Sequence, residues 1–209
     1  MLKWSVIDCT KELDDGRHRE RNEDQIDSLI IHRVGKDHRT KANLGDTGPE
    51  IALKFLHDPA IAKYTGGQNP YTFYIGKDGT IWQALPVDEV GNHARKWNKR
   101  GIGIACIGDF RDTAPSVEQF NACLNLCTYL LKCLGLRHDA VGGHSEFGAS
   151  ATNSPNKECP GSRFDVPYLR HELANAVPYS LSAMERTALK VKTRTVDRGI
   201  RWENKDCAE

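Results

Sequence analysis

The sequence lacks the features of a membrane protein, a nucleic-acid-binding protein or a small metal-folded module. No run reaches the roughly 18 apolar residues that could span a membrane, and residues 1–10 lack the apolar stretch of a signal peptide. The net charge of +1 gives no electrostatic basis for binding nucleic acid or an anionic membrane. No CxxC pair occurs, which argues against a zinc finger. We therefore expect a cytoplasmic protein that binds its ligand through local groups.

The cysteines do not have the pattern of a disulfide framework. There are seven, an odd number, and Cys123, Cys127 and Cys133 lie in one apolar run where they are expected to pack as small hydrophobes. This distribution favours folding in a reducing compartment. The 209 residues suffice for one sizeable core. We expect one domain at 28–176, between a charged extension at 1–27 and a polar extension at 177–209, and the sequence carries no signal for a particular oligomeric state.

Hydrophobic patterns predict strands that alternate with helices. Apolar runs at 28–32, 71–75, 81–85 and 101–108 indicate buried strands, and Asp78-Gly79 favours a tight hairpin between the second and third of them. Helices are predicted from Glu50 to about Asp58, from Ser116 to Gly135, and after Asp165. We therefore expect an α/β fold with a central mixed β-sheet flanked by helices.

Three potential metal ligands stand at the ends of such segments. His32 ends an apolar run, His144 follows Gly142-Gly143, and Cys159 precedes Pro160. Two imidazoles and one thiolate can hold a catalytic Zn²⁺ and leave the fourth position for water. A folded domain must bring these distant residues together. On the residues alone, His32 could instead be structural, or Cys159 could be a nucleophile with His144 as its base.

In order and spacing, these segments resemble the type 2 N-acetylmuramoyl-L-alanine amidases, the superfamily of phage lysozyme-type amidases and peptidoglycan recognition proteins. The resemblance extends from about Ser28 to about Leu173. It rests on Ile30-Ile31-His32, residues 71–81, Gly91-Asn92-His93, Ile102-Gly103-Ile104, Gly142-Gly143-His144 and residues 157–161. It implies one amidase-like domain.

The resemblance also implies an activity and a set of site residues. The substrate would be peptidoglycan or muropeptides, cut at the amide between the lactyl group of N-acetylmuramic acid and L-alanine. The implied residues are His32, His144 and Cys159 as ligands of one Zn²⁺ per chain, Tyr71 and Lys157 as catalytic residues, and His93 in the substrate groove. We add Arg95 as a partner for stem-peptide carboxylates and Trp97 as a groove wall.

Two departures from the family refine the expected function. Recycling amidases carry a glutamate where this chain has Ala105, and the segment 145–158 is longer than in compact phage enzymes. The alanine at position 105 favours catalysis by a tyrosine and a lysine. Glu146, two residues after His144, is either a substitute acid or base or a structural carboxylate. We expect a phage-type endolysin released to the wall through a separate pore. The alternatives are a cytosolic enzyme that recycles anhydromuropeptides and a non-catalytic peptidoglycan-binding module.

Overall fold

A seven-stranded sheet in the order β6-β2-β5-β3-β4-β1-β7 forms the centre of the protein. The computed structural model describes residues 5–35, 45–147, 158–176 and 205–206. The strands are β1 (Val6–Asp8), β2 (Ser28–Val34), β3 (Phe73–Ile75), β4 (Ile81–Gln83), β5 (Gly101–Ile107), β6 (Val141–Gly143) and β7 (Lys205–Asp206). β3 and β4 are antiparallel, and the other neighbours are parallel. This confirms the predicted mixed sheet.

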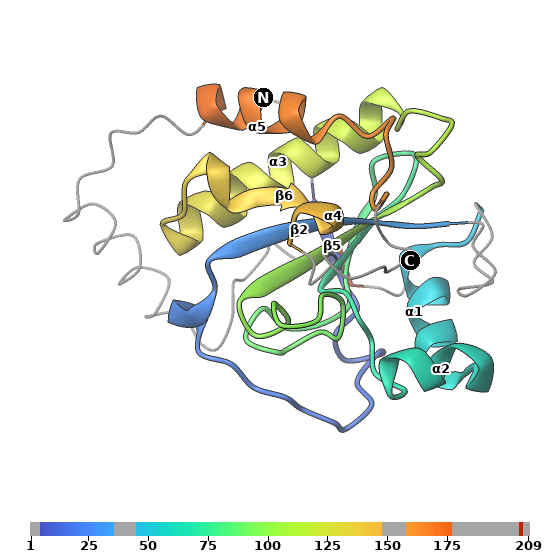
Figure 1. Ribbon diagram of the computed structural model, residues 1–209. Helices are drawn as coiled ribbons and strands as arrows, with labels where there is room; N and C mark the ends of the chain where they lie inside the picture. Colours follow the sequence, from blue (N-terminus) through green and yellow to red (C-terminus); the bar gives the residue numbers. More distant parts are fainter. Residues whose placement is uncertain (1–4, 36–44, 148–157, 177–204, 207–209) are drawn as a thin grey trace.

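Helices cover both faces of the sheet (Figure 1). α3 (Val117–Leu134) and α5 (Val166–Ala176) lie together on one face, whereas α1 (Gly48–His57) and α2 (Pro59–Thr65) lie on the other. The short α4 (His144–Phe147) directly follows β6, and single 3-10 turns occur at Glu23–Gln25 and His138–Ala140. The predicted α/β class with flanking helices is therefore confirmed.

The alternation of side chains along β2 divides two cores. Leu29 and Ile31 pack in the larger core beneath α3 and α5, whereas Val34 packs in the smaller core with α1. Because successive side chains point to opposite faces, His32 projects to the same side as Val34. β2 pairs with β5 from Ser28↔Gly101 to Val34↔Ile107, which places Ala105 directly opposite His32. The buried sheet thus presents His32 on the α1 face.

The helix ends follow the capping signals in the sequence. Ser116 Oγ accepts a hydrogen bond from the Gln119 N–H at 3.1 Å, and Gly135 ends α3 with φ of 65°. Ser116 and Gln119 have the spacing of a capping box, but the Gln119 side chain donates to the carbonyls of Ile75 (2.9 Å) and Ile107 (3.1 Å) instead. Burial explains the difference, since these strand-end carbonyls have no water to bond with. α2 was not predicted.

Parts of the terminal segments belong to the sheet. β1 pairs with β4 and with β7, although the domain boundaries at 28 and 176 stay a prediction. Within the charged extension at 1–27, Arg21 is only 6% exposed and donates to the carbonyls of Val87 (2.9 Å) and Gly101 (2.6 Å). Burial lowers the pKa of Arg21 to about 10. Arg21 therefore holds the loop ahead of β5.

The cysteines largely behave as predicted, with one exception. Cys9 is disulfide-bonded, whereas five others remain thiols, namely Cys106, Cys123, Cys127, Cys133 and Cys159. One disulfide is not a framework, but it weakens the expectation of a reducing compartment. Among the described helices, none combines the length and apolar character that crossing a membrane requires.

Candidate metal centre

The fold brings the three predicted metal ligands together. His32 comes from β2, His144 is the first residue of α4, and Cys159 lies in the loop before α5. Their ligand atoms all lie within 4.8 Å of one another, and His32 Nδ1 is 3.9 Å from Cys159 Sγ. Tetrahedral zinc bonds of about 2.0–2.3 Å place neighbouring nitrogen and sulfur ligands roughly 3.5 Å apart. The donor set and its spacing therefore fit one zinc ion after a small contraction.

A chain of hydrogen bonds fixes which nitrogen His32 presents. His93 Nε2 lies 3.1 Å from the carbonyl oxygen of Gly101, so it must carry a proton and donate. A neutral His93 then has a bare Nδ1, which accepts from His32 Nε2 at 3.0 Å. With its proton on Nε2, His32 turns the Nδ1 lone pair toward Cys159. His93 thus selects the ligating tautomer of His32.

Burial keeps the histidines of this chain of hydrogen bonds neutral. It is the main cause that lowers the pKa of His32 well below its usual value, with the nearby His144 and His93 adding to the effect. Burial also lowers the pKa of His93 to about 3 and that of His144 below its ordinary value. Because a metal binds only the neutral imidazole, the site is prepared for a cation at neutral pH.

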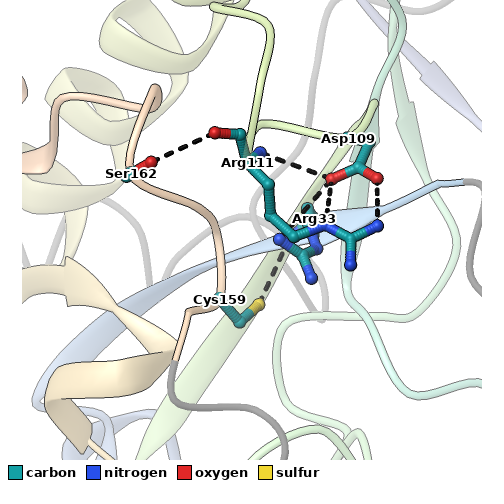
Figure 2. A network of polar contacts seen from close by, with 5 residues as sticks. All are labelled: Arg33, Asp109, Arg111, Cys159 and Ser162. Atoms are coloured by element: carbon teal, nitrogen blue, oxygen red, sulfur yellow. Dashed lines mark hydrogen bonds and ion pairs between the residues drawn. The ribbon is translucent and has the colours of Figure 1, made fainter.

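The loop that carries Cys159 is fastened at several points (Figure 2). The pairing of β6 with β2 ends at Ile31. Two residues further along β2, the backbone N–H of Arg33 donates to Cys159 Sγ at 3.4 Å. The N–H of Ser145 donates to the Cys159 carbonyl at 2.9 Å, which ties the His144 segment to the same loop. Ser162 Oγ donates to the Arg111 carbonyl at 3.1 Å. The sulfur is therefore held beside the end of β2.

Tyr71 lies beside the ligands, while Lys157 lies outside the described residues. The ring of Tyr71 is 4.9 Å from that of His32 between centroids. Phe55 and Tyr74 contact Tyr71 edge to face, at centroid distances of 5.8 and 5.6 Å, and limit how the ring can turn. Tyr71 precedes β3 instead of lying within it. The catalytic roles of both residues stay predictions.

The residues expected in the substrate groove occupy different positions. His93 is 8% exposed with both ring nitrogens engaged, so its position favours orienting His32 over touching substrate. Arg95 is exposed. The Trp97 ring packs against Phe147 of α4 at a centroid distance of 5.1 Å, with the Arg100 guanidinium 4.6 Å above it. Substrate contact by any of the three expected residues stays a prediction.

Neither of the two positions considered for a further acid or base, 105 and 146, offers a free carboxylate in the structure. Ala105, beside His32, is completely buried and offers no acid or base. Glu146 accepts from the Gly143 N–H (2.8 Å) and from Arg170 (2.7 Å), which fits a structural carboxylate. The sequence reasoning missed Arg33 and the Gly101 carbonyl. The position of Arg33 directly after His32 could have identified it as a site residue. No sequence signal identifies the backbone carbonyl of Gly101.

Comparison with known proteins gives a consistent picture. The family model described as N-acetylmuramoyl-L-alanine amidase matches residues 22–162. Among curated relatives, peptidoglycan-recognition protein 2 of Holotrichia diomphalia is 44% identical over 52 residues, 25% of this chain and 28% of that protein. Peptidoglycan-recognition protein 1 of the same insect is 35% identical over 88 residues, 41% and 43% of the two chains. The chain thus spans less than half the length of either relative.

Solved structures share the fold at low sequence identity. The amidase LysC from Clostridium intestinale aligns with a TM-score of 0.61 and 22% identity, over 82% of this chain and 98% of that one. A point mutant of Drosophila PGRP-LB, in complex with tracheal cytotoxin, aligns with a TM-score of 0.56 and 20% identity, over 85% and 96% of the two chains. Because the family model covers most of the sheet and all three ligands, the chain belongs to the N-acetylmuramoyl-L-alanine amidase family.

Proposed function

We propose that this protein is a zinc-dependent amidase that hydrolyses the bond between the lactyl group of N-acetylmuramic acid and L-alanine in peptidoglycan. One observation carries the proposal: His32, His144 and Cys159, far apart in sequence, converge with ligand atoms within 4.8 Å. When bound, zinc would polarise the amide and lower the pKa of a water to about 7. Family membership supplies the substrate class.

The chain's own residues have distinct tasks in this proposal. His93 and the Gly101 carbonyl hold His32 in the tautomer that donates Nδ1. Tyr71 lies beside His32 and contacts Phe55 and Tyr74, and in this proposal its hydroxyl would hydrogen-bond the reacting oxygen or the departing amine. Lys157, two residues before Cys159, would provide a cation for the charge that develops on the carbonyl oxygen.

A binding module without catalysis is the second candidate, and the names of the curated relatives favour it. Peptidoglycan-recognition proteins 1 and 2 match 88 and 52 residues, and a related structure holds tracheal cytotoxin. Two features support the enzyme instead: a complete set of ligands, and the chain of hydrogen bonds that orients one of them. A protein that merely binds muropeptides needs neither.

We further propose that the enzyme acts as an endolysin. Structures with the same fold include an endolysin of Thermus bacteriophage Ph2119 and an endolysin amidase from Clostridium intestinale. The alanine at position 105, opposite His32, removes the glutamate expected of a recycling enzyme. Degradation of intact sacculi separates the two functions, because a recycling enzyme would cut soluble muropeptides and leave sacculi intact.

The test is mass spectrometry of products from purified sacculi, with and without a chelator. We expect free stem peptides that begin with L-alanine, their loss in chelator, and their return on addition of zinc. A Cys159→Ser variant should lose zinc and activity together, whereas a matched Cys133→Ser variant should retain both. Peptide release that persists in chelator would overturn the zinc proposal in favour of a thiol nucleophile. Tight muropeptide binding without product would establish the binding module.

A further inference from the structure

Arg33, next to the ligand His32, has a guanidinium group that the described residues leave without a hydrogen bond. Its side chain is 17% exposed, and the buried Nη1 atom has no hydrogen-bond partner. It forms an ion pair with Asp109, whose Oδ1 lies 3.6 Å from Nη1, beyond hydrogen-bonding range. This largely buried cation therefore has an ion-pair partner, but its Nη1 lacks the hydrogen-bond acceptor that normally accompanies a buried donor.

Asp109 lies too far from Arg33 Nη1 for a hydrogen bond and is itself hydrogen-bonded to Arg111. Arg111 Nε donates to Asp109 Oδ1 at 2.8 Å, and its Nη2 bonds Oδ2 (Figure 2). The hydrogen bond from Arg111 is the main reason that the pKa of Asp109 is lowered, so the carboxylate is ionised. Two guanidinium groups thus share the Asp109 carboxylate, and Asp112 and Glu158 also act on Arg111.

This cluster adjoins the metal centre on the side of Cys159. Figure 2 shows Arg33 between Cys159 and the pair of Asp109 and Arg111. The backbone N–H of Arg33 lies 3.4 Å from Cys159 Sγ, so its side chain starts beside the proposed reaction centre. An extended peptide advances about 3.3–3.6 Å per residue, so a group one or two residues past the cleaved amide falls within reach of an arginine.

We propose that Arg33, supported by Arg111, binds a free carboxylate of the substrate's stem peptide, the α-carboxylate of its second residue. This inference rests on the proposed amidase function. An anion at Arg33 would supply the acceptor that Nη1 lacks, and guanidinium groups bind carboxylates with two parallel hydrogen bonds. Amidation of that carboxyl removes both the charge and one acceptor. The enzyme should therefore prefer stem peptides whose second residue is not amidated.

The test compares two muropeptides that differ in one group: the α-carboxyl of the second residue is free in one and amidated in the other. Turnover and, independently, the dissociation constant from titration calorimetry are measured for the wild type and for Arg33→Gln, Arg33→Lys and Arg163→Gln. Arg163 is an exposed arginine close to the Cys159 loop and is the matched control. All variants are checked for zinc content and melting temperature.

We expect Arg33→Gln to weaken binding of the free-acid muropeptide roughly 10- to 100-fold, as for the loss of one charged hydrogen-bonded contact, and binding of the amide less than threefold. Arg33→Lys should restore part of the loss, and Arg163→Gln should change neither affinity. Equal losses for both muropeptides would assign Arg33 a structural role and overturn the inference, as would no loss for either. Selective binding without turnover would refute the amidase proposal and keep Arg33 as a carboxylate site.

Discussion

Replacing His93 with alanine tests the chain of hydrogen bonds behind the metal centre. His93 accepts the Nε2 proton of His32 at 3.0 Å and lies in the interior at 8% exposure. Without it, a buried N–H loses its acceptor, and either tautomer of His32 becomes accessible. The first effect leaves a polar group unsatisfied, at a cost of about 1–3 kcal/mol.

That cost should appear as weaker metal binding. Each 1.4 kcal/mol is a tenfold change in an equilibrium constant, so about 1–3 kcal/mol corresponds to roughly 5- to 150-fold. The range agrees with the 10- to 100-fold loss of affinity typical when a residue that orients a metal ligand is removed. We therefore expect the zinc dissociation constant of His93→Ala to be roughly 5 to 150 times that of the wild type.

Competition with a chromophoric chelator measures the zinc dissociation constant of both proteins. His57→Ala is the matched control, because His57 is exposed at the end of α1, away from the described metal ligands. The circular dichroism spectrum and melting temperature of the metal-free variant verify that the fold persists. If His93→Ala kept the wild-type zinc affinity within a factor of about two, the inferred tautomer selection would be wrong.

Three further predictions follow from the same geometry. Tyr71→Phe should lower turnover on muropeptides about 10- to 1000-fold while zinc content stays near one per chain, and loss of metal would mean that Tyr71 was misassigned. In the metal-free protein, the unfolded chain takes up a proton at His93 near pH 6.5, whereas the folded chain does so near pH 3. Through His93 alone, the free energy of unfolding should therefore fall as pH decreases through this window, by on the order of 2 kcal/mol at pH 5, and the lowered pKa values of His32 and His144 add to the fall. A urea titration in which His93→Ala keeps the full slope would contradict this contribution. Gly103→Ala would place a Cβ 2.9 Å from the His93 ring, so we expect a loss of about 1–3 kcal/mol in urea unfolding and weaker zinc binding, whereas unchanged values would show that the ring has room to move.

The sequence by itself determined the main helices and strands and the residue types that could bind a metal ion. The three- and four-residue spacing between Ser116 and Gly135 produced α3, and the capping residue and the glycine fixed its two ends. The buried run ending at His32 became β2, because consecutive apolar residues suit a strand covered on both faces. These signals are local and therefore readable from neighbouring residues. The identities of His32, His144 and Cys159 belong with them, because coordination chemistry depends on residue type.

Only the tertiary structure shows the contacts of His93, Gln119 and Arg33. His93 was expected in the substrate groove, which stays a prediction, and the structure shows that it contacts His32, 61 residues away in sequence. The Gln119 side chain does not bond to the nearby helix end but donates to the buried strand-end carbonyls of Ile75 and Ile107. The guanidinium of Arg33 stands beside a carboxylate already bound to Arg111. Each of these contacts depends on which polar groups lack a hydrogen-bond partner after distant segments have packed. Such partners cannot be identified from neighbouring residues in the sequence.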